Sequence, residues 1–156
     1  MKKLLMVLAL LLVFTGCGEK EVVLDLEKVE IELNNLEITE DGETVKLFEN
    51  NTKMSNEAIE GRQIDINLFE EILFSMDMTS NSANIYIITL PKEGHEENCE
   101  VEIDNYLDKY KDNVEMYNPE EAKKIEERLE ATYGNYHIYN ISKDNAKVLD
   151  KIKTTK

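Results

Sequence analysis

Apolar side chains recur at regular intervals from residue 24 onward, and their spacing predicts the elements of the fold. Leu26, Val29, Leu33 and Leu36 follow one another at three or four residues, which is typical of a helix. The alternation over residues 29–33 also fits a strand. We expect a helix here.

Two shorter signals follow this segment. Asp41-Gly42 predicts a turn, because these residue types favour tight backbone reversals. Ser55 lies after a polar stretch and is a candidate N-cap for a short helix that ends near Gly61.

Residues 68–90 carry the strongest strand pattern. Ile72, Phe74, Met76 and Met78 alternate with other side chains, and the run from Ala83 to Leu90 is rich in Ile and Tyr. A polar loop over residues 79–82 separates the two runs, and Pro91 ends the second. This arrangement predicts an antiparallel hairpin.

Helical spacing returns after the hairpin, in the set Cys99, Ile103, Tyr106, Leu107, Tyr110 and Val114. Asn118 followed by Pro119 and two glutamates predicts the N-terminus of a second helix. We expect Ala122, Ile125 and Leu129 to face inward from that helix.

The C-terminal block predicts one more strand and a last helix. Gly134 would end the preceding helix, Tyr136–Ile141 would form a third strand, and Ser142 would cap the final helix. The element order α, α, β, β, α, α, β, α predicts an α+β fold: a small sheet of about three strands, one hairpin plus a later strand, with helices packed on one face.

The first residues have a different pattern. Lys2 and Lys3 precede an unbroken apolar run from Leu4 to Phe14. Eleven apolar residues fall short of the roughly 20 that cross a hydrocarbon core, so the run is typical of an export signal. A buried core helix is the alternative, but the run has no polar face.

Phe14-Thr15-Gly16-Cys17 resembles the lipobox of bacterial lipoproteins. The resemblance implies cleavage before Cys17 and a diacylglyceryl group on its sulfur. Two or more acyl chains bind a membrane durably, at about 0.8 kcal/mol per buried methylene. We therefore expect a signal peptide over residues 1–16, a lipidated cysteine with a short tether over 17–23, and one extracytoplasmic domain over 24–156.

Charge narrows the choice of partners. The 156 residues include 18 Lys and Arg against 33 Asp and Glu, a formal net charge of −15. An acidic chain cannot neutralise phosphates, so nucleic acid is excluded as an expected partner. We interpret the charge as favouring solubility and separation from acidic headgroups.

Three segments together resemble the bacterial lipoproteins grouped as domain of unknown function 4358. The first begins at Gln63 and reads Gln-Ile-Asp, and it leads into Phe-Glu-Glu-Ile from Phe69. The second begins at Ser82 and reads Ser-Ala-Asn-Ile-Tyr-Ile. The third begins at Gly134 and reads Gly-Asn-Tyr, followed by an apolar strand and then by Ser-Lys-Asp from Ser142. They cover most of residues 60–152. The resemblance implies no activity, cofactor or catalytic residue.

Candidate chemistry is sparse. His95 and Cys99 lie four residues apart, as two metal ligands on one helix face would, but His137 is the only other histidine. We expect a solvated His95, a buried Cys99, and no metal or cofactor. A nucleophilic Cys99 would lack an orienting group and a recognisable motif.

Two further patterns are weaker. Oxygen-bearing side chains alternate over residues 77–81 as in a calcium loop, but Ser82 replaces the required Gly and Ile88 the closing Glu. The tyrosines could line a groove for an aromatic ligand, or lie at the edges of the core. They are Tyr106, Tyr110, Tyr133, Tyr136 and Tyr139.

Two functions stay open. The first is a noncatalytic binding or interaction module at the outer face of the cytoplasmic membrane, with an unidentified protein or small-molecule partner. The second is a small membrane-tethered hydrolase that acts on cell-wall or surface polymer through two carboxylates. The chain has no Gly-rich phosphate loop and no Gly-x-Ser-x-Gly motif, so we expect the first and not an enzyme.

Overall fold

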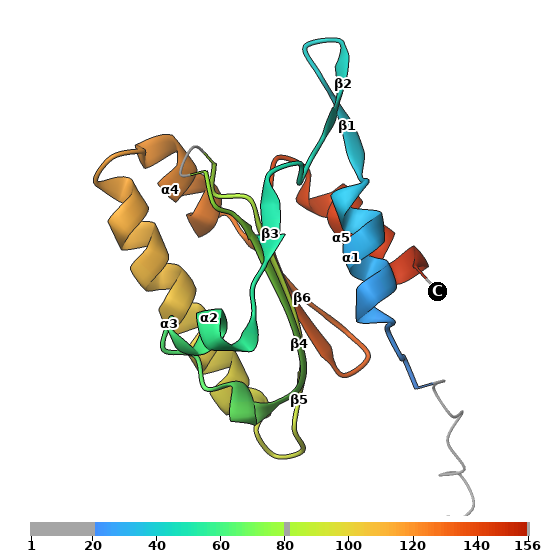
Figure 1. Cartoon of the computed structure of the whole chain (residues 1–156), viewed down its shortest axis with the longest axis vertical. Coiled ribbons are helices and arrows are strands. Elements are labelled where there is room, and N and C mark those ends of the chain that lie inside the picture. Colours follow the sequence, from blue (N-terminus) through green and yellow to red (C-terminus); the bar gives the residue numbers. More distant parts are fainter. Residues whose placement is uncertain (1–20, 80–81, 156) are drawn as a thin grey trace, which may run out of the picture.

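A computed structural model describes residues 21–79 and 82–155 (Figure 1). The helices in this part of the chain are α1 (Leu26–Asn34), α2 (Asn56–Glu60), the 3-10 helix η1 (Ile66–Leu68), α3 (Glu96–Glu115), α4 (Pro119–Glu126) and α5 (Asn145–Thr154). The strands are β1 (Glu37–Glu40), β2 (Glu43–Lys46), β3 (Asn51–Lys53), β4 (Phe69–Asp77), β5 (Ile85–Pro91), β6 (Leu129–Tyr133) and β7 (Tyr136–Ile141).

The seven strands of the described residues form two antiparallel sheets. One is the hairpin of β1 and β2, and the other has five strands in the order β3-β4-β5-β7-β6. The fold is α+β as predicted, but the prediction of a small sheet of about three strands is wrong. The predicted hairpin is β4 and β5, and the predicted later strand is β7, which pairs antiparallel with β5.

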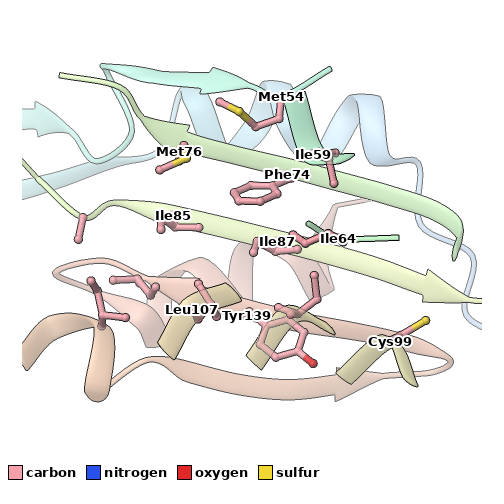
Figure 2. Packing of buried hydrophobic residues seen from close by; sticks show 14 of the residues in the cluster. Met54, Ile59, Ile64, Phe74, Met76, Ile85, Ile87, Cys99, Leu107 and Tyr139 are labelled. Carbon is pink, nitrogen blue, oxygen red and sulfur yellow. The ribbon is translucent and has the colours of Figure 1, made fainter. Parts of the chain in front are cut away.

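Helices cover both faces of the larger sheet, which corrects the expectation of one covered face. On one face, α2, α3 and α4 pack against Phe74, Ile87 and Tyr139 (Figure 2). On the other, α1 and α5 pack against Leu73, Ile88 and Ile138. Residues in the central strands are buried on both sides because each face has its own hydrophobic core.

Local capping agrees with most predicted helix starts. The side chains of Ser55 and Asn118 accept hydrogen bonds from backbone N–H groups in the first turns of α2 and α4. Asp25 caps α1 in the same way. The predicted cap at Ser142 is wrong, since Asp144 accepts from Lys147 N at 3.0 Å and caps α5.

Strand β6 replaces the last predicted turn of α4. The helix ends at Glu126, so Leu129 lies in a strand and not on a helix face. Gly134 accordingly ends no helix: it adopts φ +60° in the two-residue turn that joins β6 to β7. A Cβ at Gly134 would lie 2.5 Å from the Cβ of Val22, so the start of the described chain packs directly on this turn.

Candidate binding site

Cys17, the predicted lipidation site, lies outside the described residues, as do the signal peptide and most of the tether. The lipid attachment therefore stays a prediction. Among residues 21–79 and 82–155, no helix combines the length and the apolar character needed to cross a membrane.

His95 and Cys99 lie where the sequence predicted, at the start of α3. The His95 side chain is exposed and makes no capping hydrogen bond, whereas Cys99 is 1% exposed. The pKa of the Cys99 thiol is raised to about 11. Burial is the largest cause, and the nearby carboxylates of Glu96, Glu102 and Glu100 contribute less. No group of three or more His, Cys, Asp or Glu in the described part of the chain is placed to hold a metal ion.

Asp77, the first residue of the calcium-like pattern, is occupied by its own turn. Its Oδ1 accepts hydrogen bonds from Thr79 N at 2.7 Å and from Thr79 Oγ1 at 2.6 Å. Residues 80 and 81 of the pattern lie outside the described chain. The two bonds are those of a side-chain-stabilised turn at the end of β4.

The five tyrosines do not form one groove, because the sheet separates them. Tyr106 and Tyr110 stack on α3 at 6.1 Å between ring centroids, on the same face as Tyr139. Tyr133 and Tyr136 belong to the opposite core, under α1 and α5. All five tyrosines belong to one of the two hydrophobic cores or pack against its edge, as the second interpretation predicts.

A polar pocket lies where the β1–β2 hairpin meets the end of the β4–β5 hairpin and α4, and we call it the hairpin pocket. Its volume is about 370 Å³. Most of its lining residues carry carboxylate, ammonium, amide or hydroxyl groups, and Ile38, Val45 and Leu47 are apolar. The lining residues are Ile38, Glu40, Val45, Lys46, Leu47, Glu49, Asn50, Asp77, Thr79, Ser82, Asn84, Glu121 and Lys143.

Asn84 connects the three elements around the hairpin pocket. Its Nδ2 donates to the carbonyl oxygen of Leu47 at 3.0 Å, and its Oδ1 accepts from Lys124 Nζ at 3.1 Å. Lys124 also lies 2.7 Å from Glu121 Oε2, and that oxygen accepts from Ala83 N at 2.6 Å. These bonds give the wall beside α4 a fixed geometry.

The opposite wall is held by an ion pair between Lys143, after β7, and Glu40, at the end of β1. Lys46 of β2 donates to Asn35 Oδ1 at 3.1 Å. The hairpin pocket thus offers cationic and anionic groups beside a few apolar side chains, which suits a polar ligand or a partner side chain more than a purely apolar one.

Sequence reasoning missed this pocket. Its residues come from four separate stretches, near residues 38–50, 77–84, 121 and 143, and no motif joins them. One available signal was Asp41-Gly42, because Ile38 and Val45 alternate symmetrically around it. Asp41 and Gly42 adopt φ +51° and +86°, the paired positive values of a two-residue hairpin turn.

The fold and the pocket define a class: an α+β domain with a five-stranded antiparallel sheet between two helical layers and a polar pocket at one end. Residues 43–142, more than half of the chain, match the profile of the family described as Domain of unknown function (DUF4358). The chain belongs to this family, as the sequence resemblance indicated. The matched segment runs from β2 to just after β7 and includes all five strands of the larger sheet. No curated protein and no solved structure is significantly similar to the chain.

Proposed function

We propose that this chain is a membrane-anchored lipoprotein, attached through a diacylglyceryl group on Cys17, whose domain is a noncatalytic binding module. The observation that carries the proposal is the sequence of the first 17 residues: two lysines, eleven apolar residues, and small residues before a cysteine. The domain would then lie on the extracytoplasmic side of the cytoplasmic membrane.

The position of the hairpin pocket supports binding of a partner away from the membrane. In Figure 1 the described chain begins at the end of the molecule opposite the β1–β2 hairpin. The tether from Cys17 to Val22 spans at most about 3.6 Å per residue, so it keeps the β6–β7 turn close to the lipid. The pocket would face the aqueous side.

The carboxylates of the pocket favour binding over hydrolysis. Asp77 accepts two hydrogen bonds from Thr79, and Glu121 accepts one from Ala83 and pairs with Lys124. Both carboxylates are thus engaged by groups of the chain itself, as in the wall of a binding pocket, and this supports the noncatalytic proposal. Release of sugar from wall polymer by the wild-type chain, lost in Glu121→Gln, would contradict the noncatalytic proposal.

Replacement of Cys17 tests the anchor. We expect Cys17→Ala to lack the acylated N-terminus that mass spectrometry would detect in the wild type. Any Cys17→Ala protein from which the signal peptide has been removed should be absent from carbonate-washed membranes. Cys99→Ala is the matched control, since it removes the other cysteine of the chain and leaves the lipobox intact. An unacylated wild-type N-terminus would overturn the lipoprotein assignment.

A further inference from the structure

Strand β6 forms one edge of the larger sheet. It pairs with β7 on one side, and no other strand of the described chain pairs with it. An edge strand presents backbone N–H and C=O groups that can bind an extended segment from another molecule. The opposite edge, β3, has only three residues.

The register shows which residues of β6 present these groups. Tyr133 and Tyr136 flank the two-residue turn, and the closing pair of such a hairpin exchanges backbone hydrogen bonds. The bonded pairs then alternate, and they include Ala131 with Ile138. Glu130 and Thr132 therefore direct their N–H and C=O groups away from β7.

Acidic side chains line the face of β6 that looks toward α3. Glu100, Asp104 and Asp108 recur every four residues on α3, and Glu130 extends from β6. We call these four residues the acidic shelf. A groove of about 350 Å³ lies between the two elements, and Glu100, Asp104, Glu130 and Thr132 are among its lining residues.

Among these four carboxylates lie one guanidinium, which carries a single positive charge, and one imidazole. Arg128 lies 3.3 Å from Asp104, 3.3 Å from Asp108 and 2.6 Å from Glu130. His137 Nδ1 lies 2.9 Å from Glu100. Around the groove, burial and then the carboxylates of Asp104, Glu100 and Glu130 raise the pKa of Tyr139, which is consistent with a negative potential there.

The charge pattern selects the partner. A second copy of the chain on this edge would place two acidic shelves side by side, and each copy carries a net charge of −15. Charged residues on edge strands prevent such self-pairing in many proteins. The same charges attract a basic segment, so the β6 edge favours positively charged segments over negatively charged ones.

We propose that β6 binds an extended basic segment of a partner protein as a sixth strand, with Lys or Arg at alternate positions facing the acidic shelf. Alternate side chains of an added strand point to the same face of the sheet, so every second residue would lie over Glu130 and α3. The proposal rests on the interaction role proposed above and names the chemistry of the partner. It does not depend on the lipid anchor.

A peptide titration tests the proposal with the full chain in detergent micelles. The probe is a nine-residue peptide with Lys at every second position between Val and Thr, and the comparison peptide has Glu in place of Lys. Backbone-amide NMR should show shifts confined to β6 and the facing turns of α3. Binding of the Lys peptide should weaken with added salt, and the Glu peptide should not bind.

Two variants separate strand addition from simple charge attraction. Thr132→Pro removes an N–H group that points away from β7, and an edge strand tolerates proline at such a position. The variant should weaken the affinity for the Lys peptide by about tenfold or more. The double variant Asp104→Asn with Asp108→Asn keeps the backbone and should also weaken binding. Glu43→Gln with Glu57→Gln is the control, since it removes two exposed charges elsewhere.

The outcomes are distinct. Loss of affinity in the shelf variant and in a folded Thr132→Pro, with the control unchanged, would support the sixth strand. Absence of Lys-peptide binding to the wild type, full affinity in a folded Thr132→Pro, or equal loss in the control would overturn it. If Thr132→Pro fails to fold, the amide shifts on β6 decide between strand addition and charge alone. None of these results bears on acylation of Cys17.

Discussion

At the scale of single residues, Asn84 shows how one amide joins distant parts of the chain. It lies immediately before β5, donates to the carbonyl oxygen of Leu47 after the β1–β2 hairpin, and accepts from Lys124 of α4. Its own carbonyl oxygen accepts from Asp77 N at 2.9 Å and from Asn51 Nδ2 at 3.3 Å. The Asn84 side chain thus lines the hairpin pocket and links the segment after β2 to α4.

Truncation of this amide should destabilise the domain. Asn84→Ala removes the amide donor from the Leu47 carbonyl and one of the acceptors of the Lys124 ammonium, so we expect a loss of about 1–3 kcal/mol in the free energy of unfolding. Urea denaturation measures it. The control is Asn135→Ala, an exposed amide in the β6–β7 turn. Equal midpoints for Asn84→Ala and wild type would show that the network contributes nothing.

The thiol of Cys99 gives a pH-dependent prediction. Its pKa rises from an ordinary value near 9 to about 11 in the folded state. The folded state therefore retains the proton more strongly, and this contribution to stability is complete below pH 9 and lost as the pH rises toward 11. The urea midpoint of wild type should fall more steeply over this range than that of Cys99→Ala. Parallel curves for the two proteins would contradict the buried thiol.

At the scale of elements, periodicity predicted the parts of the fold whose apolar pattern has one interpretation. The segments α3, β4, β5 and β7 each bury a regular set of side chains, and all were predicted. Strands β1, β2 and β3 were missed because they are short, polar and half exposed. Their pairing depends on contacts that a local pattern does not contain.

Strand β6 shows an ambiguity of a different kind. Leu129 fits the helical spacing of Ala122 and Ile125, so the sequence pattern extended the helix by one turn. In the structure α4 ends at Glu126. Arg128, two residues later, forms ion pairs with the carboxylates of Asp104, Asp108 and Glu130. The acidic shelf and the hairpin pocket were equally invisible in the sequence, because each is formed by side chains that only the tertiary fold brings together.

Strand β7 should contribute strongly to stability. It lies between β5 and β6, and Ile138 is 1% exposed against α1 and α5. Removal of three carbon atoms leaves a cavity in a packed core, so Ile138→Ala should cost about 2–5 kcal/mol. Thermal unfolding measures it, with Ala146→Gly on the exposed side of α5 as a mild comparison. A melting temperature within a degree or two of wild type would show that β7 is peripheral.

At the scale of the whole molecule, the proposed lipid anchor and the fold together predict an orientation at the membrane. Val22 packs on Gly134 at the β6–β7 turn, and the β1–β2 hairpin lies at the far end of the long axis (Figure 1). A lipidated Cys17 would lie within about 18 Å of Val22, at no more than about 3.6 Å per residue. The net charge of −15 opposes contact of the rest of the surface with acidic headgroups.

Energy transfer to a membrane-bound acceptor measures this orientation. Single cysteines at two exposed positions, Asn135→Cys and Thr39→Cys, would each carry a donor dye in the lipidated Cys99→Ala protein. With acceptor-labelled lipid in the vesicle, transfer should be higher from residue 135 than from residue 39, because the first lies beside the tether and the second on the β1–β2 hairpin. Equal transfer would mean that the domain tumbles freely about its anchor. Reversed transfer would place the hairpin pocket at the lipid surface and would remove the argument that its ligand comes from the aqueous side.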